Sequence, residues 1–139
     1  MTTRGWWVKQ LADVPVVPSD EPDDYAWFPL QHHFGLTTTG INAYRATAIG
    51  QELIGEHDEL SSGHEELYYV AQGRAEFVIA GEAHLASAGT VVVVRDPSVK
   101  RQASALELET TILAIGGKPD PSFTSSWEPH HFARVPRAD

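Results

Sequence analysis

The chain has 139 residues, of which 42% are hydrophobic and 21% charged, as expected for one globular domain rather than a disordered chain. The formal net charge of −9 argues against nucleic acid and anionic membranes as partners, because both carry negative charge. The sequence contains no cysteine, which excludes disulfides, a thiolate nucleophile and Cys-ligated metals. No apolar run is long enough to span a bilayer and no secretory signal is visible, so a cytoplasmic location is expected.

Residues 1–40 are predicted to form an extended arm without a helix, because four prolines interrupt the segment. The arm carries too many aromatic side chains for a free tail. We expect them to dock onto the domain or onto a partner subunit, and we expect a homodimer. These aromatic residues are Trp6, Trp7, Tyr25, Trp27 and Phe28.

From about residue 40 the sequence alternates and is rich in β-branched and aromatic residues, which predicts a series of short strands. Gly73 is predicted to mark a tight hairpin, Gly81-Glu82 a second turn, and the valine run Thr90–Val94 a fully buried strand. Such a series predicts a sandwich or barrel over residues 41–117, followed by a tail over 118–139 that packs across the outside. The predicted strands cover 41–49, 67–71, 75–80, 83–86, 90–94, 99–105 and 110–115.

The acidic segment 51–72 carries six of the carboxylates and no Lys or Arg. Two His and two Glu fall within ten positions, and residues two apart in an extended chain share a face. Such groups suit manganese, iron, nickel, copper or zinc, and they also suit acid–base chemistry without a metal. The four residues are His57, Glu59, His64 and Glu66. Tyr68 follows Glu66 by two positions and is therefore expected on the same face as His64 and Glu66.

The sequence from His64 to Glu82 resembles the first motif of the cupin superfamily, because Gly73 follows Glu66 by seven positions. Gly89 and the turn that follows it up to Lys100 resemble the second motif, in which a Gly leads to a Pro-rich turn and one His. The resemblance covers about residues 41–116, and small single-domain bacterial cupins are the most similar. It implies an all-β fold, the double-stranded β-helix or jelly-roll barrel, with the site in its interior and usually a homodimer.

Two departures from the cupin pattern leave two alternatives for the site. Residues 59–62 occupy the window where the first motif carries its paired His, and Lys100 stands at the His position of the second. One divalent transition metal could be held by a rearranged set of ligands. Alternatively, Lys100 faces Glu66 across the barrel and supplies the positive charge in place of a metal. The candidate metal ligands are His57, Glu59, His64 and Glu66.

The resemblance implies that the barrel binds a small organic metabolite, and we expect an enzyme that isomerises, cyclises, dehydrates or oxygenates it. The alternative is a non-catalytic module that binds or senses a metabolite without a metal. The candidate catalytic residues are His57, His64, Glu66 and Lys100. The candidate substrate-binding residues are Tyr44, Tyr68, Arg45 and Arg101, of which the two arginines would hold a substrate carboxylate.

Overall fold

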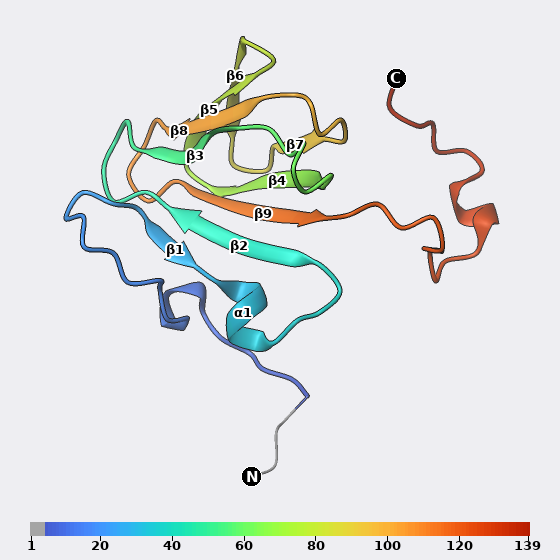
Figure 1. Ribbon diagram of the computed structural model, residues 1–139, viewed down its shortest axis with the longest axis horizontal. Coiled ribbons are helices and arrows are strands. Elements are labelled where there is room, and N and C mark those ends of the chain that lie inside the picture. The colour runs from blue at the N-terminus through green and yellow to red at the C-terminus, as the bar shows by residue number, and fades with distance from the viewer. Residues whose placement is uncertain (1–4) are drawn as a thin grey trace.

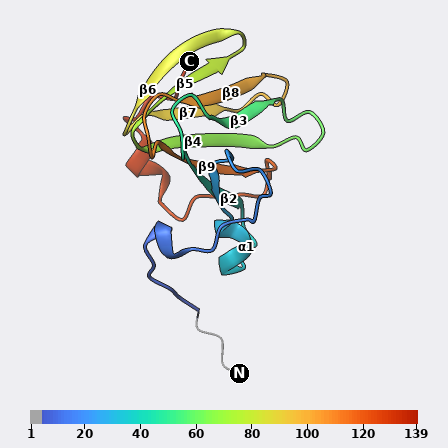
Figure 2. The same ribbon diagram turned by 90° about the vertical axis from the view of Figure 1, so that its left-hand side faces the viewer.

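The computed structural model describes residues 5–139 and consists of two antiparallel β-sheets that face each other (Figures 1 and 2). Neighbouring strands are mostly distant in sequence, so most contacts are long-range. The first sheet contains, in spatial order, β1 (Ala26–Phe28), β2 (Gly40–Arg45), β9 (Thr111–Gly117), β4 (Glu65–Gln72) and β7 (Val91–Val94). The second contains β3 (Glu52–His57), β8 (Arg101–Ala105), β5 (Arg74–Ile79) and β6 (Glu82–Ser87).

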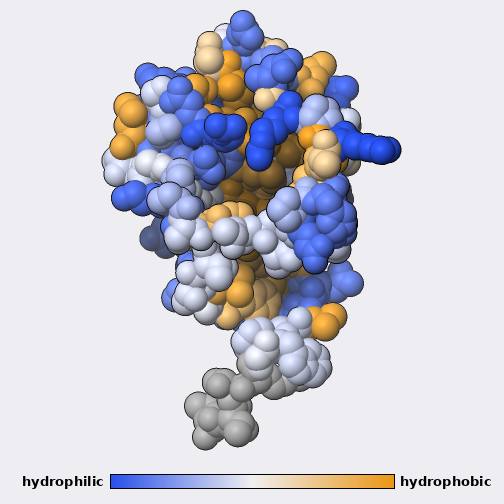
Figure 3. Space-filling model, turned by 90° about the vertical axis from the view of Figure 1, so that its right-hand side faces the viewer, coloured by the Kyte–Doolittle hydropathy of each residue, from blue (hydrophilic) through white to orange (hydrophobic). Residues whose placement is uncertain are grey.

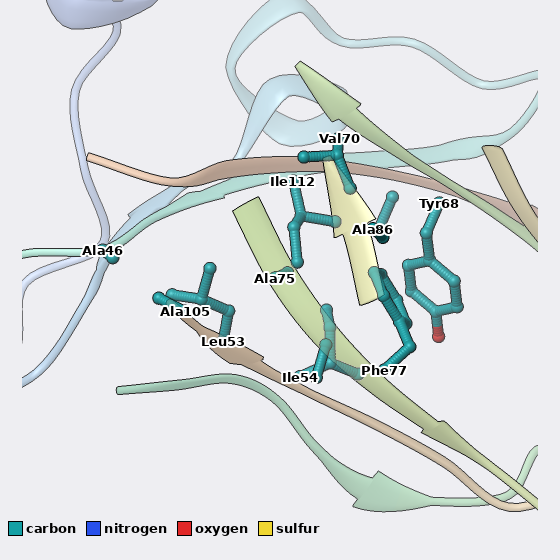
Figure 4. Close-up of a cluster of buried hydrophobic side chains, with 12 residues drawn as sticks. Ala46, Leu53, Ile54, Tyr68, Val70, Ala75, Phe77, Ala86, Ala105 and Ile112 are labelled. Carbon is teal, nitrogen blue, oxygen red and sulfur yellow. The ribbon is translucent and has the colours of Figure 1, made fainter. Parts of the chain in front are cut away.

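The hydrophobic core lies between the two sheets and is built from alternate residues of their strands (Figure 4). Side chains from the two sheets pack against each other there. The ring centroids of Tyr68 and Phe77, for example, lie 5.8 Å apart. The alternation predicted from the sequence is therefore the alternation of core and outer positions. The buried members of the core are Ala46, Leu53, Ile54, Tyr68, Val70, Ala75, Phe77, Ala86, Ala103, Ala105, Ile112 and Ala114.

Gly73 connects the two sheets rather than forming the predicted hairpin. β4 pairs with β7 and β9 in one sheet, whereas β5 pairs with β6 and β8 in the other. Gly73 has a φ of +75°, and a Cβ at this position would lie 2.8 Å from the Cα of Thr110. The predicted hairpin is therefore wrong, and the glycine is required because the chain crosses between layers against Thr110.

The valine strand β7 is not fully buried, contrary to the prediction. It lies at the edge of its sheet, where Val91 and Val93 are 53% and 56% exposed, and only Val94 is buried. A continuous apolar run cannot reveal whether a strand is central or at an edge. The turn predicted near Gly81 is present as the two-residue connection Ala80–Gly81 between β5 and β6, and both residues have positive φ.

The N-terminal segment is more regular than predicted. It contributes β1 to the edge of the first sheet and then forms the helix α1 (Leu30–Phe34), so the expectation of an arm without a helix is wrong. Pro29 immediately precedes α1, and Gly35 ends it with a φ of +66°. A second apolar cluster around Phe28 packs the segment against the outer side of β2. The 3-10 turn η1 (Leu11–Asp13) precedes these elements.

The C-terminal tail extends away from the end of β9 (Figure 1). Its aromatic side chains are largely exposed, which differs from the expected packing. It contains the 3-10 turn η2 (Pro129–Phe132). Trp127 and Phe132 are exposed, and Phe123 lines a groove between the tail and the outer side of the first sheet. On this side of the molecule the surface is hollowed, with apolar atoms at the floor of the hollow (Figure 3). Among the described residues, no helix is long and apolar enough to cross a membrane.

Candidate functional site

Three strand ends meet at one end of the barrel and bring the polar side chains together. β3 ends at His57, β8 begins at Arg101, and these two residues are paired in register. Glu66 is the second residue of β4 in the opposite sheet, and its carboxylate nevertheless reaches both of them. The acid–base cluster, defined here as His57, Glu59 and Glu66, thus bridges the two layers.

His57 faces hydrogen-bond acceptors with both ring nitrogens. Nδ1 lies 2.7 Å from the carbonyl oxygen of Gly55, and Nε2 lies 3.0 Å from Glu59 Oε1 and 3.4 Å from Glu66 Oε1. A protonated imidazole would donate from both ring nitrogens to these oxygens. Burial lowers the pKa of His57, but the Gly55 hydrogen bond and the negative charges of Glu66 and Glu59 outweigh burial and raise it. His57 thus lies between two carboxylates, and its protonated form is favoured relative to a free imidazole.

Glu66 accepts hydrogen bonds from three sides at a single oxygen. Besides His57, its Oε1 accepts the hydroxyl of Tyr68 at 2.8 Å and Nη1 of Arg101 at 3.1 Å. Arg101 is fully buried, and its Nη1 also lies 4.0 Å from Glu59 Oε1. One permanently charged guanidinium thus lies behind both carboxylates and compensates for the burial of their charge.

Glu59 is held from the loop between β3 and β4. Its Oε1 accepts from His57, and its Oε2 accepts from the hydroxyl of Ser62. Burial raises the pKa of Glu59, but the Ser62 hydrogen bond and the charge of His57 outweigh it, so this pKa lies below its usual value. The carboxylate is ionised at neutral pH beside an imidazole whose pKa is raised, which is an arrangement suited to paired acid and base work.

The cluster opens into a cavity of about 210 Å³ with a mixed aromatic and polar wall. Tyr25 and Tyr44 form part of this wall and meet edge to face at 5.5 Å. Burial raises the pKa of Tyr44 to about 12, and burial with the neighbouring charge of Glu66 raises that of Tyr68 further. The phenols therefore remain hydrogen-bond donors at neutral pH. The full lining is Tyr25, Tyr44, Leu53, Ile54, Gly55, His57, Glu59, Glu66, Tyr68 and Ala114.

Several predicted site residues lie elsewhere. Lys100 is exposed and lines a different surface pocket, so its predicted pairing with Glu66 is wrong, and Arg101 holds that place instead. Arg45 donates to Thr111 Oγ1 and lies over the ring of Phe28, away from the cavity. His64 precedes β4 and is not brought into the acid–base cluster. Neither predicted arginine lines the cavity, so the structure gives no support to their expected contact with a substrate carboxylate.

Two residues of the site were not foreseen from the sequence. Tyr25 belongs to the N-terminal segment, whose backbone is tied to the barrel where Thr47 and Gln51 donate to the carbonyls of Asp24 and Asp23. No local pattern connects residue 25 with the acidic segment. Ser62 had a weak signal, because it follows Glu59 by three residues in a turn.

The resemblance to cupins implies a metal, and a divalent cation needs at least three protein ligands with free lone pairs. Ligand atoms of His57, Glu59 and Glu66 lie within 4.8 Å of one another, which is enough for a three-ligand site. However, Nε2 of His57 already lies 3.0 Å from Glu59 Oε1 and 3.4 Å from Glu66 Oε1, so a cation would have to replace these contacts. Arg101 already compensates for the charge of those carboxylates. The buried guanidinium of Arg101, and not a shortage of ligand atoms, is therefore what argues against a resident divalent metal in this cluster.

Known structures share this architecture. A sugar phosphate isomerase of the cupin superfamily from Silicibacter pomeroyi has a TM-score of 0.63 at 17% identity, covering 79% of this chain and 74% of that one. A predicted oxalate decarboxylase from Thermotoga maritima has a TM-score of 0.63 at 15% identity, covering 81% of this chain and 100% of that one. The chain therefore has the cupin fold, the double-stranded β-helix, as the sequence predicted.

The similarity to these structures is at the level of the fold and does not identify the activity of this chain. A proposed sugar phosphate isomerase from Acidithiobacillus ferrooxidans has a TM-score of 0.57 at 20% identity, and the match covers 69% of this chain but only 60% of that one. No family model and no curated protein matches the sequence. At these identities the likeness establishes the fold, and the chemistry has to be argued from the site itself.

Proposed function

We propose that this chain is an enzyme that moves protons on a small, uncharged, hydroxyl-bearing metabolite, without a metal. The observation that carries the proposal is the position of His57, whose Nε2 lies between Glu59 and Glu66 at the wall of the cavity. A protonated imidazole next to an ionised carboxylate provides an acid and a base in one place. Isomerisation of an aldose to a ketose, or the reverse, uses this pair most directly.

In such a reaction Glu59 takes a proton from the carbon next to the carbonyl, and His57 Nε2–H gives its proton to the carbonyl oxygen. The product of this step is an enediol, with His57 neutral and Glu59 protonated. In the second step His57 takes a proton from the neighbouring hydroxyl, and Glu59 returns its proton to the adjacent carbon. Both residues end in their starting state, so protons and electrons balance.

Glu66 has a different part from Glu59 in this proposal. Its Oε1 already accepts from Tyr68 and Arg101 as well as from His57, so its negative charge is well stabilised. These contacts occupy Oε1 and fix the orientation of the carboxylate, and the charge of Glu66 raises the pKa of His57. Glu66 therefore positions and charges the imidazole rather than taking the substrate proton.

The charge of the cavity wall supports an uncharged substrate. Besides its tyrosines, the ionisable residues that line it are Glu59, Glu66 and His57, and no Lys or Arg is among the lining residues. A phosphate or carboxylate group of a substrate would meet these carboxylates without a free cation to receive it. The volume of about 210 Å³ is also below the roughly 300–1,000 Å³ of pockets for drug-sized ligands, which favours a molecule no larger than a monosaccharide.

The proposal is tested with matched sugars in D₂O, followed by proton NMR. Pentoses and hexoses are compared with their phosphates and uronates, and solvent deuterium at the carbon next to the carbonyl reports proton transfer even when net turnover is small. We expect incorporation into at least one uncharged sugar. Binding of a neutral sugar without exchange would support the non-catalytic module instead, and preferential use of a phosphate or uronate would contradict the proposed substrate class.

A further inference from the structure

We propose that Arg101 is the residue that keeps the acid–base cluster free of divalent metal ions, and that an imidazole at this position turns the cluster into a metal site. The number of ligand atoms would not by itself exclude a metal from the cluster. His57, Glu59 and Glu66 already offer three ligand atoms within 4.8 Å of one another, and three protein ligands are enough for a catalytic zinc site. The obstacle is the buried positive charge behind them.

The guanidinium depends on the same oxygens that a metal would use. Arg101 is 0% exposed, and its Nη1 lies 3.1 Å from Glu66 Oε1 and 4.0 Å from Glu59 Oε1. Its Nε and Nη2 have no hydrogen-bond partner among the described residues. The two carboxylates are thus its only ion-pair partners in the described part of the chain. A metal ion that bound both carboxylates would leave the buried charge of Arg101 uncompensated.

Deprotonation of the guanidinium does not remove its competition with a metal ion for the carboxylates. Arginine stays charged at any ordinary pH, whereas a lysine or histidine in the same place could become neutral when a cation arrives. The carboxylates therefore always meet a cation that is part of the chain. Competition for Glu59 and Glu66 is built into the fold rather than set by the solution conditions.

Position 101 is suited to a ligand once the charge is removed. Arg101 begins β8, is paired in register with His57, and shares its inward side with the buried Ala103 and Ala105. An imidazole at this position starts from the same inward-facing backbone and adds a fourth donor of a type that transition metals favour. The substitution Arg101→His therefore exchanges the competing cation for a ligand.

The test is a titration with Co²⁺, followed by visible absorption and calorimetry, on wild-type protein and three variants. Arg101→His removes the charge and adds a donor, Arg101→Met removes the charge alone, and Arg101→His/Glu66→Gln removes one carboxylate ligand as a control. We expect Arg101→His to bind one Co²⁺ at least about 100-fold more tightly than wild type, with Arg101→Met in between. The double variant is expected to lose most of this gain.

Two results would overturn the proposal. One is wild-type protein that binds one Co²⁺ as tightly as Arg101→His. The other is a folded Arg101→His, shown by circular dichroism and cooperative thermal unfolding, that binds Co²⁺ no better than wild type. If the variants do not fold, the wild-type titration still decides, because weak binding supports the proposal and tight binding contradicts it. None of these readouts depends on turnover, so the result is independent of the proposed enzymatic function.

Discussion

Replacing Arg101 with methionine is expected to lower the free energy of unfolding by about 3 kcal/mol at pH 7, the lower end of what breaking a buried ion pair costs. The loss arises because the carboxylates of Glu59 and Glu66, whose side chains are only 17% and 14% exposed, remain close together without their cation. The estimate is at the lower end because methionine also removes two buried nitrogen donors, Nε and Nη2, that have no partner among the described residues. Urea unfolding followed by circular dichroism measures the difference.

Lys100→Met is the matched control, because the neighbouring cation is exposed and lies outside the cluster. We expect this change to alter stability by less than about 1 kcal/mol. The effect of Arg101→Met should also shrink at acid pH, once the pH falls through the lowered pKa of Glu59, because a protonated carboxyl no longer needs a cation. Equal effects of the two substitutions at pH 7 would mean that Arg101 does not hold the cluster together.

His57→Gln and Glu59→Gln are each expected to reduce proton exchange or turnover by about 10²- to 10⁴-fold, the usual contribution of a positioned acid or base. Both glutamines retain hydrogen-bonding capacity but cannot transfer the proton. His64→Gln is the matched control, because His64 lies outside the acid–base cluster, and it should leave the rate nearly unchanged. A loss of similar size in His64→Gln would contradict the assignment of the acid to His57.

The pH dependence of the rate follows from the two shifted groups. The pKa of His57 is raised above 6.5, so its acid form persists to higher pH than usual and the alkaline limb lies above that value. The pKa of Glu59 is lowered below 4.5, so its base form persists to lower pH and the acidic limb lies below that value. A broad bell-shaped profile is expected, and His57→Gln should remove its alkaline limb.

The fold was largely predictable because the strands alternate and are separated by turn residues. Alternation reports which face a residue takes, but it does not report which strand becomes its neighbour. For this reason the connection at Gly73 was mistaken for a hairpin, although it crosses between sheets, and β7 was mistaken for a central strand. Strand pairing here is set by long-range contacts that no short window contains.

The site was predictable where its residues are close in sequence. His57, Glu59, Glu66 and Tyr68 come from one acidic segment, and the structure brings them together. The correct position of the cation was indicated by the strand pattern. Arg101 lies on the same face of β8 as the small residues Ala103 and Ala105, and these residues are buried. The resemblance to the second cupin motif indicated Lys100 instead, which is one residue earlier and therefore on the opposite face.

Tyr25 shows the other limit. It reaches the cavity only because β1 pairs with β2 and the preceding loop is held by Thr47 and Gln51. Nothing in residues 1–40 indicates which aromatic side chain turns inward. The homodimer expected from the resemblance stays a prediction, and sedimentation velocity of the full chain would measure it directly.

The metal content of the wild-type protein tests the account most directly. Untagged protein, purified without chelator and then incubated with manganese, iron, nickel, copper or zinc, is desalted and measured by elemental mass spectrometry. If Arg101 supplies the positive charge of the site, every metal remains far below one equivalent. One equivalent of a single transition metal that is lost in Glu66→Gln would contradict the account, because the carboxylates paired with Arg101 would then be metal ligands.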